Sequence, residues 1–296
     1  MLGPTEHVPV LAAEVVTWLR PTAGQIVVDG TLGGGGHARL LAEAVGREGT
    51  VIALDRDPAA VERAAEKLRG LPIQLAAANY SDIPEVLSGL GVPAVDGILL
   101  DLGLSSDQLA DASRGFSFHA QGPLDLRFDP ERGEPAWKLL ERLSAEHLAD
   151  LIYQYGEERY SRRIARQIVE RRTARPVRTA ADLAELIRLA VPRTHHERID
   201  PATRTFQALR IAVNDELKWL EVALRRLPEC LRPGGRLAVI SFHSLEDRLV
   251  KEAFRDDSRL SSITRRPVRP GDEEAAHNPR ARSAKLRVAE KKMVSR

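Results

Sequence analysis

Gln25-Ile-Val-Val-Asp-Gly-Thr-Leu-Gly-Gly-Gly-Gly-His37 joins a short apolar run to an acid and four consecutive glycines. The run Ile26–Val28 has the length of a buried parallel strand, and a helical pattern of apolar residues begins at Ala38. A strand, a glycine turn and a helix in this order bring the backbone close to a nucleotide-like ligand at the helix N-terminus. The stretch therefore predicts an α/β fold with a ligand site at the turn.

The α/β pattern continues on both sides of a long interruption. Strand patterns alternate with helical ones, which is typical of βαβ units and a mostly parallel sheet. The further strands that we expect are 50–55, 73–77, 95–101 and 236–242, with two weaker candidates at 263–268 and 286–289.

The rhythm of strands and helices breaks after Asp101. Residues 102–133 are rich in Gly, Ser, Asp and Pro, and only helical patterns follow up to a long one that runs from Asp200 to Leu227. A loop of this length inside a domain is usually functional or disordered, and its phenylalanines favour a function. We therefore expect an all-helical inserted domain for substrate recognition. The predicted division is 1–106 for the first part of the main domain, 107–212 for the insertion and 213–296 for the second part.

Composition narrows the class of protein. At 296 residues, 43% of them hydrophobic and 29% charged, the chain has the composition of a soluble globular protein with one large domain and an insertion. Its N-terminus has neither the basic start nor the apolar core of a signal peptide, so we expect a cytoplasmic location. The single Cys230 excludes an intramolecular disulfide, and no Cys/His spacing requires a metal.

Arginine dominates the positive charge. It provides 37 of the 44 basic residues, although the net charge is only +2. Its planar guanidinium suits phosphate groups and stacks on bases. A coding bias or a heat-adapted surface explains the excess equally well, so the charge alone does not identify a partner.

The acids around the glycine turn indicate the kind of ligand. Gly33-x-Gly35-x-x-Ala38 fits the dinucleotide fingerprint, which also permits a nicotinamide-dependent dehydrogenase or a merely structural turn. Asp29 precedes the turn, where a carboxylate suits an ammonium group rather than a pyrophosphate. Asp55 ends the second strand, where an acid typically accepts hydrogen bonds from ribose hydroxyls. Together they favour S-adenosylmethionine, which has an amino-acid end and a ribose but no phosphate.

A second group of candidates follows the fourth strand, at Asp101-Leu-Gly-Leu-Ser-Ser106. Because the carboxyl ends of neighbouring parallel strands share one crevice, we expect Asp101 to lie beside the glycine turn. An acid in a polar loop can also be a simple cap or turn former.

The histidines admit two interpretations each. His243 follows the strand 236–242 and is either an acid–base group or part of a helix cap. His37 either contacts the cofactor or packs inside its helix. The pair His195-His196 has no partner at metal-ligand spacing and is expected in a solvated loop.

Motifs along nearly the whole chain resemble one family, the bacterial methyltransferases that methylate N4 of a cytosine in 16S ribosomal RNA. They occur in one order, insertion included, and are far more specific than a glycine loop. The matching pieces are His7-Val-Pro-Val-Leu11, Asp29-Gly-Thr-Leu-Gly-Gly-Gly-Gly-His37, Asp55-Arg-Asp57, Asp101-Leu-Gly-Leu-Ser-Ser-Asp-Gln108, Arg114-Gly-Phe-Ser-Phe118, Gly122-Pro-Leu-Asp-Leu-Arg127, Tyr155-Gly-Glu-Glu158, Ser161-Arg-Arg-Ile-Ala165, Pro201-Ala-Thr-Arg-Thr-Phe-Gln-Ala-Leu-Arg210, Pro233 to Arg248 and Asn278-Pro-Arg-Ala-Arg-Ser283.

The resemblance implies a Rossmann-like class I methyltransferase that uses S-adenosylmethionine on 16S ribosomal RNA or the small ribosomal subunit, near the decoding centre. It also allows a homodimer. The chain departs from the family at Asp200, where the family usually has His. The cofactor positions that the resemblance implies, together with Asp29, are Gly34, Gly35, Gly36, His37, Asp55, Tyr80, Asp101 and Gln108.

The chemistry needs acceptors for the protons of the cytosine amine and a surface for a base that has left its stack. The candidate acceptors are Asp101 and the backbone carbonyls of Leu102–Leu104, supported by the hydroxyls of Ser105 and Ser106. The candidate stacking surface comprises Phe116, Phe118 and the turn Gly122–Arg127. Candidate phosphate contacts on one predicted helix are Arg159, Arg162, Arg163, Arg166, Arg171 and Arg172. An alternative of another class is an RNA-binding or ribosome-assembly protein with this fold and no activity.

Overall fold

The computed structural model describes residues 9–118, 121–192 and 200–293, so His7 and the pair His195-His196 lie outside the described residues. The chain divides into two compact units. The sheet unit comprises Met1–Ser105 and Leu217–Arg296, and the helical unit comprises Ser106–Glu216. The sequence placed the insertion at 107–212, a few residues short of this division at its C-terminal end.

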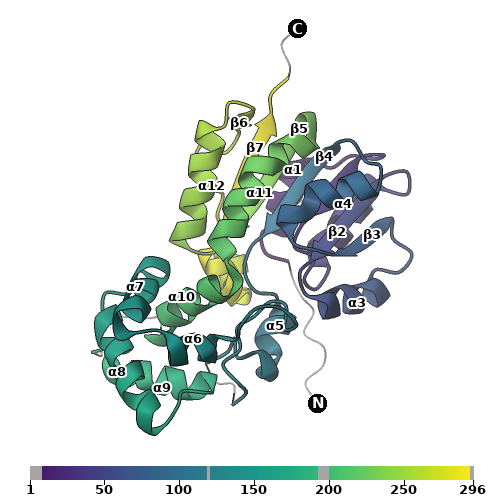
Figure 1. Cartoon of the computed structure of the whole chain (residues 1–296). Coiled ribbons are helices and arrows are strands. Elements are labelled where there is room, and N and C mark those ends of the chain that lie inside the picture. Colours follow the sequence, from purple (N-terminus) through teal and green to yellow (C-terminus); the bar gives the residue numbers. More distant parts are fainter. Residues whose placement is uncertain (1–8, 119–120, 193–199, 294–296) are drawn as a thin grey trace. The chain divides into compact units, whose positions relative to one another are not determined.

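The sheet unit is built on a seven-stranded sheet of the order β3-β2-β1-β4-β5-β7-β6 (Figure 1). The first five strands pair in parallel, and β7 is antiparallel to both of its neighbours. This order confirms the predicted Rossmann-like class I methyltransferase fold. The strands are β1 Ile26–Asp29, β2 Thr50–Asp55, β3 Ile73–Ala77, β4 Val95–Asp101, β5 Leu231–Ser241, β6 Leu260–Ser262 and β7 Lys285–Lys291.

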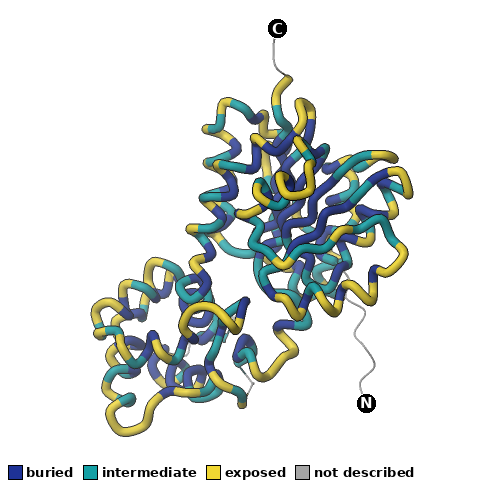
Figure 2. The backbone as a smooth tube through the Cα atoms, turned by 45° about the vertical axis from the view of Figure 1, so that its right-hand side comes forward, coloured by how far each residue is buried: buried dark blue, intermediate teal, exposed yellow. Residues whose placement is uncertain are grey.

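Helices cover both faces of this sheet, which explains why its central strands are apolar throughout. One core cluster joins the sheet to α1, α2 and α3, and the other joins it to α4, α11 and α12. The strands form the buried interior of the unit, while exposed residues gather in turns (Figure 2). The helices are α1 Ala12–Leu19, α2 Gly36–Val45, α3 Pro58–Lys67, α4 Ile83–Gly89, α11 Glu216–Cys230, α12 Ser244–Asp256 and α13 Asp272–His277, with short 3₁₀ helices η1 Tyr80–Asp82 and η3 Pro279–Ser283.

Two elements differ from the sequence prediction. The long helical pattern after Asp200 is interrupted at Asp215, which adopts a left-handed φ of 51° and separates α10 (Ala202–Asn214) from α11. The predicted strand 263–268 was wrong, because β6 ends at Ser262 and only a single bridge joins Val268 to Leu286. Pro267 lies in this segment, and proline has no N–H to donate to a strand ladder.

The helical unit contains no named strand in its described residues. Thr179 caps α9 as its sequence predicts, since its Oγ1 accepts a hydrogen bond from the Asp182 N–H. Asp200 caps α10 by accepting from the Ala202 N–H and pairs with Arg188 at 2.6 Å, which gives this departure from the family pattern a structural role. The other elements are α5 Ser106–Ala110, η2 Ala112–Arg114, α6 Ala136–Arg142, α7 Ala145–Gly156, α8 Ser161–Ala174 and α9 Ala180–Ala190.

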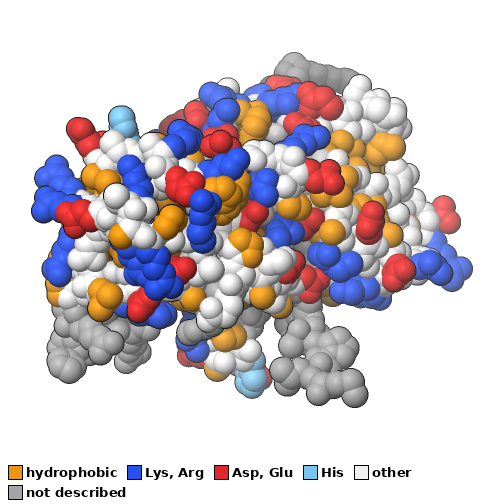
Figure 3. Space-filling model, turned by 60° about the horizontal axis from the view of Figure 1, so that its bottom comes forward, with side chains coloured by type: hydrophobic (Ala, Val, Ile, Leu, Met, Phe, Trp, Pro, Cys, Tyr) orange, Lys and Arg blue, Asp and Glu red, His pale blue; other side chains and the backbone are white. Residues whose placement is uncertain are grey.

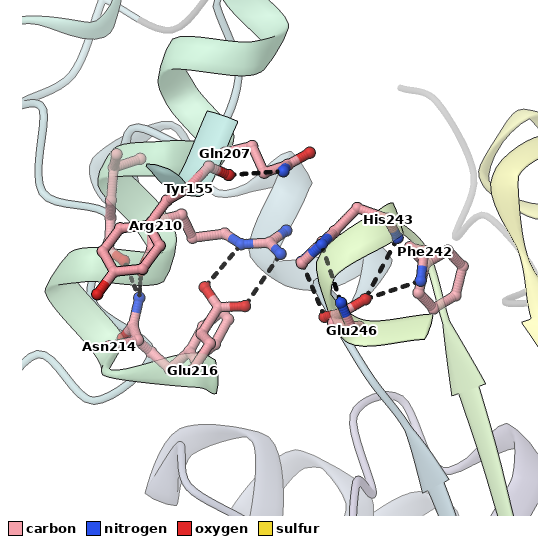
Figure 4. Close-up of polar contacts among 10 residues, drawn as sticks. Tyr155, Gln207, Arg210, Asn214, Glu216, Phe242, His243 and Glu246 are labelled. Carbon is pink, nitrogen blue, oxygen red and sulfur yellow. Dashed lines mark hydrogen bonds and ion pairs between the residues drawn. The ribbon is translucent and has the colours of Figure 1, made fainter. Parts of the chain in front are cut away.

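The long loop of the helical unit is held by buried hydrogen bonds. The side chain of Asn214 accepts from the Phe128 N–H at 2.7 Å and donates to the Leu126 carbonyl at 2.7 Å. The nearby pair Arg210–Glu216 closes the end of α10 (Figure 4). The loop is thus a built part of the unit, stabilised by about 1 kcal/mol for each such bond.

In the described part of the chain, no helix has both the length and the apolar character that a membrane crossing requires.

Candidate functional site

Thr31 links the carboxyl ends of the neighbouring strands β1 and β4. Its hydroxyl oxygen accepts a hydrogen bond of 2.6 Å from the Asp101 N–H, and its own N–H donates to Asp29 Oδ1 at 3.1 Å. The strand register places Asp29 opposite Leu99, two residues before Asp101. The expected neighbourhood of Asp101 and the glycine turn is therefore present, and Thr31 fixes it.

Asp29 is fully buried and the Asp101 side chain is 12% exposed, and each carboxylate has one buried oxygen without a hydrogen bond in the described part of the chain. Asp29 Oδ2 and Asp101 Oδ1 accept no hydrogen bond from any residue that the structure describes. Burial raises the pKa of Asp29 to about 7, and burial together with the negative charges of Asp29 and Glu246 raises that of Asp101 to about 7. Two desolvated acids with open oxygens are costly unless a positively charged group with N–H donors binds them.

Two further side chains contact the region of Asp101. His37, at the start of α2, is buried and has its Nε2 3.6 Å from Oδ2 of the slightly exposed Asp101 side chain. Arg280, from η3 near the C-terminus, donates a hydrogen bond to the Leu104 carbonyl. Its positive charge opposes the rise in the pKa of Asp101. The sequence predicted no role for Arg280. The feature of the sequence that pointed to this residue was its place in the family-like motif Asn278–Ser283.

The glycine turn is held by Asp55. Its Oδ2 accepts a hydrogen bond of 2.8 Å from the Gly33 N–H, and its Oδ1 accepts one of 2.9 Å from the Asp57 N–H. Gly33 and Gly35 have left-handed φ values of 49° and 82°, and a Cβ on Gly35 would lie 3.0 Å from the Leu68 side chain. The turn thus requires glycine at these positions for its conformation and its packing.

Of the other predicted site residues, Ser105 and Tyr80 lie near the glycine turn of the sheet unit, whereas Ser106 and Gln108 belong to the helical unit. A Cβ on Gly33 would lie 3.3 Å from Ser105, and one on Gly30 would lie 3.1 Å from Tyr80. Ser106 and Gln108 belong to α5 of the helical unit, so their proposed roles stay predictions.

Gly36 and His37 open α2. Gly36 packs on Pro9, because a Cβ there would lie 3.2 Å from that side chain, and Gly34 lies in the turn before it. The N-cap position, Gly35, provides no side-chain acceptor for the first N–H groups of this ten-residue helix. Amide groups at a helix N-terminus attract a carboxylate.

His243 has the structural role that was weighed for it. It is the N-cap of α12, where its Nδ1 accepts from the Glu246 N–H and Glu246 Oε2 accepts from the His243 N–H at 3.3 Å (Figure 4). This reciprocal arrangement is a capping box. It explains the residues of this motif without an acid–base function.

The chemistry of the donor set fits S-adenosylmethionine. Its ammonium group offers the positive charge and N–H donors that the open oxygen of Asp29 lacks, and its ribose hydroxyls can donate to Asp55. A pyrophosphate beside two buried acids would be repelled, which argues against a dinucleotide.

Comparison with known proteins gives the same assignment. A family model described as the MraW methylase family matches residues 4–292. A "Ribosomal RNA small subunit methyltransferase H" from Rhodopirellula baltica is 53% identical, covering 97% of this chain and 92% of the relative. A protein of the same name from Deinococcus radiodurans is 52% identical, covering 96% of this chain and 89% of the relative.

Among solved structures, an rRNA methylase from Streptococcus thermophilus aligns with 95% of this chain and 94% of its own, with a TM-score of 0.45 and 12% identity. The family match spans both units and confirms the predicted family together with its cofactor, S-adenosylmethionine. The chain belongs to the MraW methylase family.

Proposed function

We propose that this methylase transfers a methyl group from S-adenosylmethionine to N4 of a cytosine in 16S ribosomal RNA, near the decoding centre. The names of the curated relatives support a small-subunit ribosomal RNA substrate. The observation that carries the proposal is the pair Asp29 and Asp101, two carboxylates at adjacent strand ends that each have one buried oxygen without a hydrogen bond from any described residue.

The roles of the acids follow from their surroundings. When bound, S-adenosylmethionine supplies a sulfonium-activated methyl group, so the protein needs no covalent nucleophile. Asp29 holds the ammonium end of the cofactor, and Asp55 keeps the glycine turn in place through the Gly33 N–H. Asp101 would orient the cytosine amine by accepting from its N–H, and would take up a proton as the nitrogen–carbon bond forms and the sulfur–methyl bond breaks.

One predicted proton acceptor also has a structural role. The Leu104 carbonyl already accepts a hydrogen bond from Arg280. The Leu102 backbone N–H donates to the Ile240 carbonyl, which fixes the start of the same turn. The proposed acceptors for the amine are the Asp101 carboxylate and the carbonyls of Leu102–Leu104, with the Ser105 and Ser106 hydroxyls in support.

The stacking surface also narrows. Phe116 is 5% exposed and packs on Phe128 with ring centroids 5.9 Å apart, so it belongs to the interior of the helical unit. Leu124 and Leu126 of the turn Gly122–Arg127 are likewise buried. Phe118 is less buried and meets Phe206 edge-on, which leaves it as the proposed platform for the base.

We propose that the helical unit binds RNA through part of α8. Of its predicted phosphate contacts, Arg172 donates to the Leu140 and Leu143 carbonyls, and Arg171 lies within 4 Å of two acids. Arg159 precedes the helix, which begins at Ser161. The arginines that remain exposed on the helix are Arg162, Arg163 and Arg166.

Reversing these three charges together (Arg162→Glu, Arg163→Glu and Arg166→Glu) is expected to weaken RNA binding. If all three contact phosphates, the slope of log affinity against log salt should fall by roughly 2, since each contact releases about 0.7 of a counterion on single-stranded RNA. A filter-binding titration at several salt concentrations measures this slope. Unchanged affinity in the triple variant would contradict the assignment.

A matched control uses Arg47→Glu with Arg69→Glu, two exposed arginines of the sheet unit. A change in net charge affects both variants alike. The loss of RNA affinity for each reversed charge should therefore be smaller in the control, which removes no proposed phosphate contact.

The proposed function itself is tested with labelled S-adenosylmethionine and unmodified small-subunit RNA or particles, followed by nucleoside analysis. The expected product is N4-methylcytidine. Label at another position or base would disprove the cytosine-N4 assignment. RNA binding without any transfer would favour an assembly protein, and binding of NAD(H) in place of S-adenosylmethionine would favour a dehydrogenase.

A further inference from the structure

Arg280 comes from the far end of the chain to the turn that follows β4. It lies in η3, where the neighbouring Ala281 is fully buried and fixes the segment against the core. From there its guanidinium donates to the Leu104 carbonyl, three residues after Asp101. Burial removes water from the Arg280 guanidinium, so nearby negative charge contributes to its stabilisation.

Asp101 supplies this negative charge. The groups that act on its carboxyl are His37 of α2 at 3.6 Å, Asp29 of β1, Glu246 of α12 and Arg280 of η3. Asp29 and Glu246 raise the pKa of Asp101, whereas Arg280 lowers it, and Asp101 in turn opposes the lowering of the pKa of Arg280 by burial.

We propose that Arg280 is a positioning residue: it fixes the Leu102–Leu104 turn and favours the ionised form of Asp101, which accepts a proton. Within this acidic cluster, the Arg280 guanidinium is hydrogen-bonded to the turn and supplies positive charge that favours the ionisation of Asp101. The effect of Arg280 on the rate of methyl transfer rests on the proposed function, whereas its effect on the pKa of Asp101 does not.

Arg280→Met is expected to raise the pKa of Asp101 by about 1 unit or more, as loss of a nearby opposite charge does. Carboxyl-carbon NMR of protein labelled at aspartate measures this directly, with Asp101→Asn to identify the signal. The acid limb of kcat/KM should move to higher pH by the same amount, with activity partly restored near pH 9. An unchanged Asp101 titration overturns the proposal.

Arg280→Lys separates the two effects. The lysine retains the charge but not the planar guanidinium, so the acid limb should stay near that of the native protein while activity falls at every pH. A merely structural role would give Met and Lys variants that lose activity equally, with unshifted pH profiles. If the Met variant fails to fold, Arg280→Gln serves the same titration. Failure of native protein to methylate cytosine would refute the proposed function and leave the NMR result standing.

A second observation concerns the segment 264–270, which we term the arginine arch. It is bonded to β7 at two places: Thr264 Oγ1 accepts from the Val288 N–H at 2.9 Å, and Val268, just before Arg269, exchanges two backbone hydrogen bonds of 2.9 Å with Leu286. Pro267 and Pro270 restrict the backbone between and after these bonds. The arch is therefore a fixed platform rather than a loose loop.

The arginines of the arch differ from those around it. Arg265, Arg266 and Arg269 are exposed, and none lies within 4.0 Å of an acid in the part of the chain that the structure describes. By contrast, Arg259 pairs with Asp257 and Glu229, and Arg287 pairs with Asp247. On the face drawn in Figure 3, basic side chains generally lie among acidic ones.

We propose that the arginine arch binds phosphates of the RNA substrate, which gives the sheet unit an RNA contact of its own. This inference rests on the proposed function. Three unneutralised guanidinium groups on a backbone bonded to β7 at two places match phosphate oxygens, and the fixed backbone lowers the entropy lost on binding. Asp272 and Glu273 follow in the first turn of α13, where the helix N-terminus stabilises acids, and limit the patch on that side.

Arg265→Glu with Arg266→Glu is expected to lower the salt slope of RNA binding by roughly 1.4, against little change in the matched pair Arg47→Glu with Arg69→Glu. Binding is measured on naked small-subunit RNA and on assembled particles. A loss on particles alone would show that the arch contacts ribosomal protein and would overturn the proposal, as would no loss on either. Absence of methylation by native protein would refute the proposed function, while the binding comparison would still decide the arch.

Discussion

Asp101→Asn is expected to slow methyl transfer by roughly 10²–10⁴-fold, the usual contribution of a positioned proton acceptor. The amide retains the size of the side chain and leaves the backbone bond to Thr31 intact, because that bond uses the Asp101 main-chain N–H. It cannot take up the amine proton, however. Single-turnover transfer of labelled methyl to small-subunit RNA, at saturating cofactor, measures the loss.

The pH dependence gives an independent check on Asp101. Its pKa is raised to about 7, so the carboxylate is the major form only above this pH. The native kcat/KM should therefore fall by up to tenfold for each pH unit below about 7. The apparent pKa of this acid limb of the profile is a property of the Asp29–Asp101 pair, because the two charges interact. A native profile flat between pH 5.5 and 8 would contradict this role.

Asp96→Asn is the matched control for Asp101. Asp96 lies at the other end of β4, where it accepts from the Ile26 N–H and pairs with Arg232 at 2.8 Å. Its replacement should lower stability and leave the rate of the chemical step close to native. Retained turnover in a folded Asp101→Asn protein would remove Asp101 from the mechanism.

Asp29→Asn is expected to weaken S-adenosylmethionine binding by about 100-fold or more, since loss of one partner of a buried ion pair costs several kcal/mol. Isothermal titration without RNA measures this affinity, so the result does not depend on the identity of the methyl acceptor. Binding to native protein should also weaken below pH 7, because protonation of Asp29, whose pKa is about 7, removes the charge that holds the ammonium group.

The same substitution should stabilise the protein without cofactor at alkaline pH. An acid whose pKa is raised on folding destabilises the folded state once ionised: the cost begins above its ordinary pKa of 3.8 and is complete above about 7. Asn resembles the protonated acid, so the variant should melt a few degrees higher than native protein at pH 8.5 and no higher near pH 4. Added cofactor should raise the melting temperature of the native protein only.

Asp57→Asn provides the control for Asp29. Asp57 is equally buried and lies at the same edge of the sheet, where its Oδ1 caps α3 by accepting from the Ala59 N–H. Asparagine caps helices as well as aspartate does. Cofactor affinity should therefore be unchanged in this variant. A similar loss of affinity in both variants would mean that Asp29 acts through the fold rather than through its charge.

Local patterns in the sequence were sufficient for the elements and for the edge of the sheet that carries the site. Apolar runs of strand length and a glycine turn before a helix depend on a few adjacent residues, and parallel pairing then brings Asp29 and Asp101 together. Local patterns did not predict a break between two helices where one apolar periodicity continues across both of them. The apolar periodicity of 200–227 hides the left-handed Asp215, which interrupts the hydrogen bonding without changing the pattern.

By itself the sequence determined the fold class, the cofactor and the family, because these follow from motifs that are contiguous in the chain. The tertiary structure decided the partners that each side chain meets. Only folding brings Arg280 to the turn after Asp101, across 176 residues from Leu104, and buries Phe116. It also separates the arginines of α8 into internal hydrogen-bond donors and exposed charges. The physical reason is that burial and charge act through space, so the open oxygens of Asp29 and Asp101 and their raised pKa values exist only when distant elements exclude water from them.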